Sequence, residues 1–400
     1  MDDVKLDELA TWITEAGLAG GSETEMLAGF CKRARAAGLP IGRVLVVLDT
    51  LHPTHEGHAF RWDRNEPETL YKEYGRTNQG EMAEMWQRST FYHLFHTGEP
   101  YIRARLTDEI VARFSNLEDD RAAGMSEFIG VLTRFGPAGA IGEMDCLYSA
   151  WYTDLPEGFE AHHKIAIKRL VPFLAGAIKS VSLSRVARTL AETYLGRDAA
   201  ELVLSGRIER GIADRIEAVV WFSDLSGYTT ITDSAPPEQI IPLLNDYAEV
   251  IVSAIRDQGG DVLKLIGDGA LAMFTNPDSC KACTAAISAA LAAEQGIAAL
   301  NQRRAADNLP TTHMYLGLHI GEMFFGNIGS QERLDFTIVG PAVNEASRIA
   351  AMCRSADQTI LASAAFAAAL RDAGPRLVSC GRYALRGVKR PQELFTLDRT

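Results

Sequence analysis

The pattern of apolar and polar positions divides the chain near residue 205, and the first half mixes helix and strand periods. Apolar residues recur at helical spacing over 6–16 and 24–37, which predicts two amphipathic helices. A β-branched apolar run over 41–48 predicts a strand, and the alternation over 58–62 predicts its hairpin partner. The other predicted elements are a helix over 81–96, strands over 127–134 and 142–151, and a helix over 159–181.

A helix-rich connector is predicted from residue 183 to residue 212. One apolar face runs along it at helical spacing, formed by Leu183, Val186, Leu190 and Tyr194. A short parallel two-helix seam between two copies of the chain would bury that face. Packing on its own domain would bury it equally well, so both interpretations stay open.

Two carboxylates lie where apolar strands of the second half end. A buried strand over 218–222 stops at Ser223-Asp224, and after a predicted helix over 237–258 a hairpin places Asp268 at its tip. If the first strand lies beside that hairpin, both carboxylates sit at one edge of the sheet. Close carboxylates repel each other unless a cation lies between them, and Mg²⁺ favours carboxylate and phosphate oxygens. We therefore expect Asp224 and Asp268 to share a metal ion.

The loop after Asp224 is typical of a phosphate-binding segment. Gly227 lets the backbone approach a ligand closely, and the N–H groups of residues Ser226, Gly227, Tyr228 and Thr229 can then meet phosphate oxygens at a helix start. Neither carboxylate alone is strong evidence for a site. Asp-Gly, as at Asp268, occurs in ordinary hairpins, and an aspartate before a helix, as at Asp224, is often only a cap. Together, at matching strand ends, they favour a metal and phosphate site.

A third segment adds a basic residue to this chemistry. A strand over 314–320 and a glycine-rich stretch over 326–329 are followed by 335–340, which leads into a helix. Asn344 and Arg348 on that helix are four residues apart and therefore share one face. An arginine there can offer its guanidinium to the negative charge of a phosphoryl transition state.

In this order the three segments resemble the class III nucleotidyl cyclases, over about residues 218–397. The motifs are FSDLSGYT, GGDVLKLIGDGALAMF and YLGLHIGEMFFGNIGSQERLDFTIVGPAVNEASRIAAMCR. The resemblance implies a ferredoxin-like βαββαβ palm that dimerises head to tail, with active sites at the dimer interface. It also implies two ions, Mg²⁺ or Mn²⁺, in each active site.

The resemblance assigns the metal and transition-state residues. The metal ligands match Asp224, Asp268 and the backbone carbonyl of Leu225. The pair that acts in the transition state matches Asn344 and Arg348. The carboxylates are expected to come from one subunit, and Lys264, Thr337, Asn344 and Arg348 from the other.

The resemblance also implies how the base and the distal phosphates are bound. The adenine-selecting lysine matches Lys264, and its partner matches Thr337, the variant of the bicarbonate-responsive branch. The lysine for the distal phosphates matches Lys389, with Arg386 or Arg390 as alternatives, because LRGVKRPQELF departs from the common spacing.

The chemistry of this selector favours ATP over GTP. The Lys264 ammonium can only donate, which suits N1 of adenine, and the Thr337 hydroxyl can accept from N6. Guanine has a donor at N1 and an acceptor at O6, so the same two side chains fit it less well. The expected function is an adenylate cyclase that acts as a homodimer. The alternatives are a guanylate cyclase and a catalytically silent nucleotide-binding module, while a diguanylate cyclase, suggested only by GGDVL, would lack the Asn344 and Arg348 helix.

The first half resembles GAF-like or PAS-like sensory domains. The nearest match is YSAWYTDLPEGFEAHHKIAIKRLVPFLAGAI, which is similar to the last strand and closing helix of GAF domains. We expect a regulatory domain over 1–182, the helical linker over 183–212 and the cyclase domain over 213–400. Bicarbonate, another small ligand, light and a partner protein all stay open as the signal.

Three histidines, His52, His55 and His58, gather in the segment HPTHEGH. Imidazoles this close together could bind a metal ion or haem. A solvated turn beside Pro53 and Gly57 is the more common arrangement for such a segment. The sequence leaves both interpretations open.

Composition and charge narrow the class of function further. The net charge of −12 argues against general nucleic-acid binding, which needs a basic surface. The start MDDVKLDELA lacks the pattern of a signal peptide, and the best apolar run, 170–178, is short for a membrane span. Six cysteines do not indicate a disulfide framework, and Cys280 with Cys283 is typical of a helix core. We therefore expect a cytoplasmic protein without a membrane span.

Overall fold

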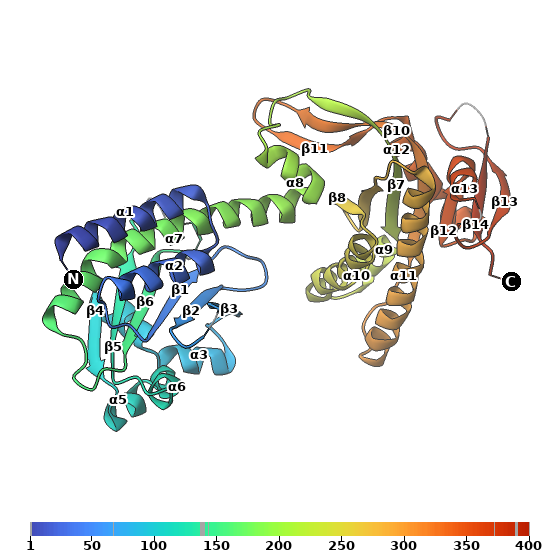
Figure 1. Ribbon diagram of the computed structural model, residues 1–400. Coiled ribbons are helices and arrows are strands. Elements are labelled where there is room, and N and C mark those ends of the chain that lie inside the picture. The colour runs from blue at the N-terminus through green and yellow to red at the C-terminus, as the bar shows by residue number, and fades with distance from the viewer. Residues whose placement is uncertain are drawn as a thin grey trace. The chain divides into compact units, whose positions relative to one another are not determined.

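The computed structural model describes residues 2–66, 68–136, 141–142, 144–371, 373–388 and 391–399. The chain forms two compact units, residues 1–190 and 191–400. Each unit combines a sheet with helices and has its own hydrophobic core, which confirms the expected mixed α and β class (Figure 1).

The first unit is built on a six-stranded antiparallel sheet in the order β3-β2-β1-β6-β5-β4. Its strands are β1 (Arg43–Asp49), β2 (Gly57–Asp63), β3 (Leu70–Tyr74), β4 (Tyr101–Arg105), β5 (Glu127–Arg134) and β6 (Cys146–Thr153). Its helices are α1 (Asp3–Ala19), α2 (Glu23–Ala36), α3 (Gly80–Gln87), α4 (Thr90–Thr97), α5 (Asp108–Arg113), the 3-10 turn η1 (Ser115–Leu117), α6 (Glu118–Ala122) and α7 (Ala161–Leu195).

Helices cover both faces of this sheet. On one face, Phe30 of α2 and Trp151 of β6 meet edge to face with ring centroids 5.9 Å apart, and Leu170 of α7 is buried in the same cluster. On the other face, Leu94 of α4 and Phe128 of β5 belong to a second cluster. A slip of one residue in a strand would exchange the two apolar sets, so this burial fixes the register of the sheet.

Most elements expected in this unit are present, but the helix boundaries and edge strands differ. The single helix expected over 81–96 is wrong, because Ser89 separates two helices and caps the second by accepting the N–H of Tyr92. The strand expected over 142–151 begins only at Cys146. The edge strands β3 and β4 were not expected, because their sequences LYKEY and YIRAR are too short and too polar to give a clear apolar alternation.

The apolar face of the predicted connector is partly used within the first unit. Leu183 of α7 packs against the core of that unit, and Val186 of the same helix is buried, in agreement with the second of the two interpretations. Further along the same helix, Tyr194 is 78% exposed. The last part of the connector face therefore leaves an apolar side chain for another partner.

The second unit is built on an eight-stranded sheet in the order β13-β14-β12-β10-β7-β9-β8, with β11 paired to β10. Its strands are β7 (Ala213–Leu225), β8 (Asp261–Ile266), β9 (Gly269–Phe274), β10 (Met314–Gly329), β11 (Leu334–Val339), β12 (Ile360–Ser363), β13 (Leu377–Tyr383) and β14 (Gln392–Leu397). Its helices are α8 (Arg197–Leu204), α9 (Tyr228–Ser234), α10 (Pro237–Asp257), α11 (Ser279–Ala306), α12 (Pro341–Ala356) and α13 (Ala364–Leu370).

Alternate residues of β7 face two different cores. Trp221 is buried with Tyr247 in the cluster that α10, α11 and α13 form on one face of the sheet. Val220 is buried with Phe336 and Ala346 in the cluster that includes α8 and α12. Because both faces are covered, the polar residues of β7 can gather only where the strand ends.

The short helix α8 is fixed to strand β8 by a buried carboxylate. Asp261 accepts the backbone N–H of Arg197 at 2.9 Å and that of Asp198 at 3.3 Å. Gly196 precedes the helix at φ +85°, where an added Cβ would lie 2.7 Å from the carbonyl oxygen of Val262. Only glycine fits this close approach, so the start of α8 is held directly against β8.

Two helices, α7 and α11, are long and apolar enough to cross a membrane by length and composition. The apolar run over 170–178 is part of α7. In each helix, 44% of the most apolar window is buried inside the protein, and core helices of soluble proteins meet the same length and composition criteria. This is weak evidence for a membrane span.

Candidate active site

The end of β7 and the tip of the β8–β9 hairpin bring Asp224 and Asp268 together. Ser223 of β7 pairs with Ala270 of β9, next to Asp268. The backbone N–H of Leu225 donates to Oδ2 of Asp268 at 3.2 Å. The convergence that the sequence suggested for these two carboxylates is therefore present in one chain.

A glycine makes this convergence possible. A Cβ added to Gly269 would lie 2.1 Å from the carbonyl oxygen of Ser223, well inside van der Waals contact. The hairpin can approach β7 this closely only because residue 269 has no side chain. The Asp-Gly sequence at 268–269 therefore favours the hairpin turn and also allows the turn to pack closely against β7.

Asp268 perturbs the ionisation of Asp224. Partial burial, and then the neighbouring Asp268, raise the pKa of Asp224 to about 6. A carboxylate pair with no cation is an unfavourable arrangement at neutral pH, and a divalent cation would relieve it. The donor set, two carboxylates and a nearby backbone carbonyl, consists of oxygens and so fits Mg²⁺ or Mn²⁺.

We expect Asp224→Asn to stabilise the metal-free protein at pH 7.5. Asp224 loses its proton at an ordinary pKa of 3.8 in the unfolded chain and only near 6 in the folded protein. Ionised Asp224 therefore destabilises the fold above pH 6, and this penalty fades as the pH falls towards 3.8. Because the side chain is partly exposed, the melting temperature in EDTA should rise by only roughly 1–3 °C at pH 7.5 and not at pH 4. An equal rise at both pH values would contradict the repulsion.

The loop after β7 has fewer free donors than the sequence suggested. The N–H of Ser226 donates to the carbonyl oxygen of His313 at 2.8 Å, so it is already used. Gly227 adopts φ +67° and precedes helix α9, which begins at Tyr228. The backbone N–H groups of Gly227, Tyr228 and Thr229 remain as the candidates for phosphate contacts.

Lys264 has a partner that sequence reasoning missed. Its ammonium, on β8, forms an ion pair with the carboxylate of Asp335 on β11, and both side chains are partly exposed. Thr337, the expected partner, lies two positions further along β11 and therefore on the same side of that strand. The sequence shows that Asp335 and Thr337 are two residues apart and would share one side of a strand. It does not show that this side faces Lys264 on β8, because that contact depends on the tertiary structure.

Asn344 and Arg348 project from the exposed side of α12. The opposite side of this helix rests on β10, where a Cβ added to Gly317 would lie 2.3 Å from the carbonyl oxygen of Ala346. Asn344 and Arg348 are both exposed. Among the residues that the structure describes, none forms a hydrogen bond or ion pair with the Arg348 guanidinium. This guanidinium is available to a ligand or to a second protein chain.

The expected distal phosphate ligand, Lys389, lies outside the described residues, as does its alternative Arg390. The other alternative, Arg386, is exposed in the segment between β13 and β14. The basic residue that would hold the distal phosphates therefore stays a prediction.

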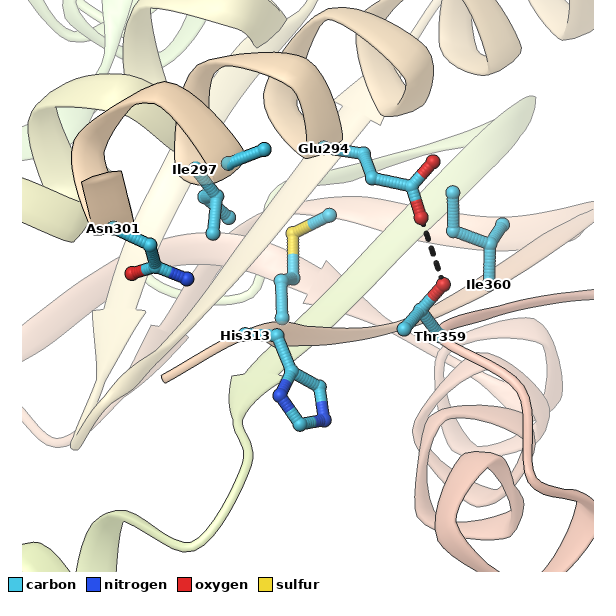
Figure 2. A pocket seen from close by; sticks show the side chains of 8 residues that line it. Glu294, Ile297, Asn301, His313, Thr359 and Ile360 are labelled. Carbon is cyan, nitrogen blue, oxygen red and sulfur yellow. Dashed lines mark hydrogen bonds between the residues drawn. The ribbon is translucent and has the colours of Figure 1, made fainter. Parts of the chain in front are cut away.

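One cavity is lined by Asp268 of the carboxylate pair, and a second one lies away from the pair. The first, about 180 Å³, is lined by Leu225, Asn245, Tyr247 and Asp268 among others. The second, about 150 Å³, lies between α11 and the ends of β10 and β12, and its lining includes Glu294, which accepts the hydroxyl of Thr359 at 2.9 Å (Figure 2). No predicted site residue lines the second cavity. Both are smaller than the roughly 300–1,000 Å³ of typical ligand pockets.

Residues 213–399 match the family model described as the adenylate and guanylate cyclase catalytic domain. Among curated proteins, the chain is 31% identical to Adenylate cyclase 1 of Rhizobium meliloti over 169 residues, which are 42% of this chain and 25% of that protein. It is 32% identical over 213 residues to an uncharacterized protein of Mycobacterium tuberculosis, covering 53% of this chain and 37% of that protein. The chain thus spans well under half the length of these relatives.

Solved structures of both kinds of cyclase are also similar to part of this chain. The adenylyl cyclase CyaB from P. aeruginosa is 27% identical, with a TM-score of 0.44 and coverage of 47% of this chain and 97% of that chain. The guanylyl cyclase Cya2 is 27% identical, with a TM-score of 0.40 and coverage of 46% and 93%. The family match and the curated relative show that residues 213–399 are similar to the adenylate and guanylate cyclase catalytic domain.

Proposed function

We propose that this protein is an adenylate cyclase, which converts ATP to 3′,5′-cyclic AMP and pyrophosphate at the interface of a homodimer. One observation carries the proposal: Asp224 and Asp268 meet at one sheet edge, while Arg348 presents an exposed guanidinium that no described residue binds. The cavity beside Asp268 is too small for a nucleotide, which is expected if a second subunit supplies the rest of the site.

The fold of the second unit supports a palm-type cyclase domain. From β7 to β10 the main elements follow the order β-α-β-β-α-β, and the strands lie in the order β10-β7-β9-β8. We assign this arrangement to the ferredoxin-like palm. In such a homodimer two equivalent sites would form across a two-fold axis.

Each residue of the proposed site has a defined task. Asp224, Asp268 and the carbonyl of Leu225 would hold two ions, Mg²⁺ or Mn²⁺, which when bound activate the ribose 3′-hydroxyl and hold the triphosphate. The N–H groups at the start of α9 orient the phosphates. Arg348 of the other subunit stabilises the charge on the α-phosphate as pyrophosphate leaves, and Asn344 positions the ribose.

The selector for the base comprises Lys264, Thr337 and Asp335. In the proposed complex, Lys264 donates to N1 of adenine and Thr337 accepts from N6. Asp335 holds the ammonium in place, since the two form an ion pair in the free chain. Thr337 is also the basis for proposing a relation to the bicarbonate-responsive branch, with bicarbonate as one candidate regulator.

The first unit is proposed to be a GAF-like sensory domain that regulates the cyclase. Its six-stranded antiparallel sheet, covered by helices on both faces, supports this assignment. The cysteines of the chain, all free, are consistent with a cytoplasmic protein.

Product identification tests the proposal. The full-length protein is incubated with ATP or with GTP, in each case with Mg²⁺ or Mn²⁺, and the products are separated by chromatography and mass spectrometry. We expect cyclic AMP and pyrophosphate from ATP, at a rate well above that of cyclic GMP from GTP. Faster formation of cyclic GMP would favour the guanylate cyclase, a kind also found among the similar structures. No cyclic product from either nucleotide would favour the silent binding module.

A further inference from the structure

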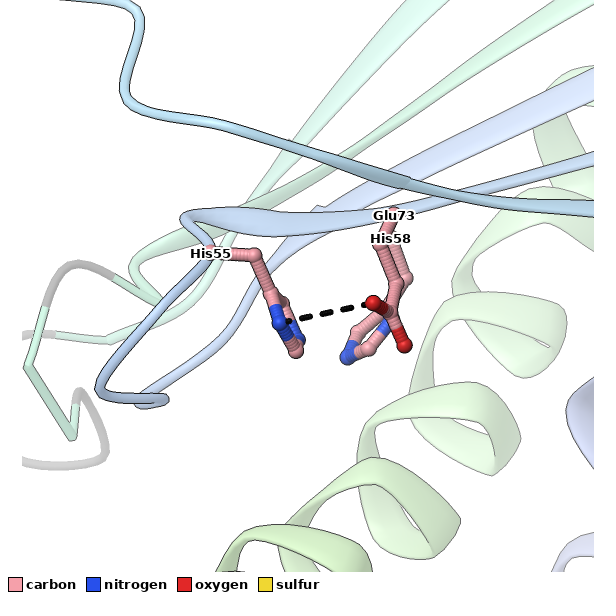
Figure 3. A group of neighbouring side chains, drawn as sticks. All are labelled: His55, His58 and Glu73. Atoms are coloured by element: carbon pink, nitrogen blue, oxygen red, sulfur yellow. Dashed lines mark ion pairs between the residues drawn. The ribbon is translucent and has the colours of Figure 1, made fainter. Parts of the chain in front are cut away.

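Two histidines and a glutamate converge at the edge of the first unit's sheet (Figure 3). His58 of β2 lies directly opposite Glu73 of β3 in the antiparallel register, and His55 lies two residues before the start of β2. One ligand atom from each of the three side chains lies within 4.8 Å of the other two. The backbone of two paired strands therefore sets the positions of His58 and Glu73, and the short loop before β2 adds His55.

His55 is buried without the partners that an imidazole needs. The residue is only 8% exposed, and within the described part of the chain its Nε2 has no hydrogen-bond partner. Its Nδ1 lies 3.5 Å from the hydroxyl of Thr54 and 3.7 Å from Oε2 of Glu73, both long for a hydrogen bond. A buried imidazole without a short hydrogen bond at either nitrogen is unfavourable, and a ligand bound to one of the nitrogens would supply a partner.

The hydrogen bonds around Tyr71 prepare His58 and Glu73 for such a ligand. The Tyr71 hydroxyl donates its one hydrogen to Oε1 of Glu73 at 3.0 Å. Its 2.6 Å contact with Nδ1 of His58 must then be donated by the histidine, which leaves the lone pair on Nε2. Glu73 likewise keeps Oε2, the oxygen that faces His55, free of Tyr71. Ligating histidines in metal proteins are commonly held by a second hydrogen bond in this way.

We infer that His55, His58 and Glu73 form a binding site for a divalent transition-metal ion of the zinc type. Two imidazole nitrogens and one carboxylate oxygen suit Zn²⁺ and are a poor set for Mg²⁺. In a tetrahedral zinc site the ligand atoms are about 3.3 Å apart. The distance of 3.7 Å between Nδ1 of His55 and Oε2 of Glu73 is close to this value. The Glu73 side chain is 53% exposed and can move to complete the site, with water as a fourth ligand.

His52 is not part of the proposed site. Its ring stacks on that of His55 with centroids 3.8 Å apart, so it lies beside the neighbouring ring and not across the cluster from it. Its Nδ1 already interacts with the hydroxyl of Thr54 at 3.1 Å. The three-histidine arrangement suggested by HPTHEGH is therefore replaced by two histidines and a glutamate from the next strand. A substitution of His52 is a matched control for substitutions of the proposed ligands, because it removes a neighbouring imidazole that is not expected to bind the metal ion.

Zinc titration of the full-length protein tests this site. Protein stripped with EDTA is dialysed into millimolar Mg²⁺, which occupies oxygen-only sites, and Zn²⁺ binding is followed by calorimetry and by metal analysis. We expect one zinc per chain in the wild type, in His52→Ala and in the double variant Asp224→Asn/Asp268→Asn. Affinity should fall by at least about 100-fold in His58→Ala and Glu73→Gln, and by about 10- to 100-fold in Tyr71→Phe.

The variants also separate loss of the site from loss of the fold. Glu73→Gln changes a half-exposed side chain at constant size, so circular dichroism should show an unchanged fold even if a histidine variant is unstable. Binding of Co²⁺ in place of Zn²⁺ should give the visible absorption of a tetrahedral ion in the wild type and not in Glu73→Gln. A wild type that binds no zinc, or a Glu73→Gln variant that binds it as tightly as the wild type, would overturn the inference.

Discussion

An equal mixture of the Asp224→Ala and Arg348→Ala variants should regain about a quarter of the wild-type cyclase activity, although each variant alone is almost inactive. In the proposed homodimer the carboxylates of one subunit meet Arg348 of the other. Random pairing makes half of the dimers mixed, and each mixed dimer has one intact site out of two. Each single variant should lose at least about 10²- to 10³-fold in kcat, since it lacks either a metal ligand or the charge that stabilises the transition state.

The matched control is a mixture of two variants with defects on the same side of the site. Asp224→Ala with Asp268→Ala should stay inactive, because every site then lacks one carboxylate. Co-expression with two different affinity tags isolates the mixed dimers, and cyclic nucleotide formation is measured on them directly. If purified mixed dimers of Asp224→Ala and Arg348→Ala remain as inactive as the parents, the shared site is wrong.

Lys264→Glu should change the preference between ATP and GTP by on the order of 10²- to 10³-fold in kcat/KM. The ammonium can only donate a hydrogen bond, which suits N1 of adenine, whereas a glutamate can only accept one, which suits N1–H of guanine. The variant also places a carboxylate near Asp335, and this repulsion should lower activity on both nucleotides. The ratio of the two kcat/KM values is therefore the quantity to measure.

A charge change elsewhere in the same unit is the control for this effect. Lys281 is exposed on α11 and has no part in the proposed site, so Lys281→Glu should leave the ratio unchanged. Lys264→Gln, which can both donate and accept, should give an intermediate ratio. If Lys264→Glu turns over both nucleotides with the wild-type ratio, Lys264 does not select the base.

The carboxylate pair could be predicted from sequence because local signals mark it. Asp224 ends an apolar run and Asp268 sits in an Asp-Gly turn, and both signals depend only on neighbouring residues. The close packing at Gly269 was not visible, since it depends on how near the hairpin comes to β7. The role of Asp335 was missed for the same reason, because its partner Lys264 lies 71 positions away on another strand.

The first unit shows the opposite balance between local and tertiary information. The histidines of HPTHEGH stood out in the sequence, yet Glu73 was not considered, because β3 is a short polar edge strand without a clear alternation. The break at Ser89 was overlooked because apolar residues continue at helical spacing on both sides of it. The first case depends on the pairing of β2 with β3, and the second on the cap formed by Ser89. Hydrophobic periodicity reports neither strand pairing nor helix capping.

The attachment of α8 to β8 has a mechanical consequence. Asp261 holds the first turn of the helix that opens the second unit, and Lys264 lies three positions further along the same strand. A pull on the amino-terminal end of α8 therefore acts directly on the strand that carries Lys264, with no other strand between them. A displacement of the residues that precede α8 would therefore change the position of β8, and with it the ion pair between Lys264 and Asp335.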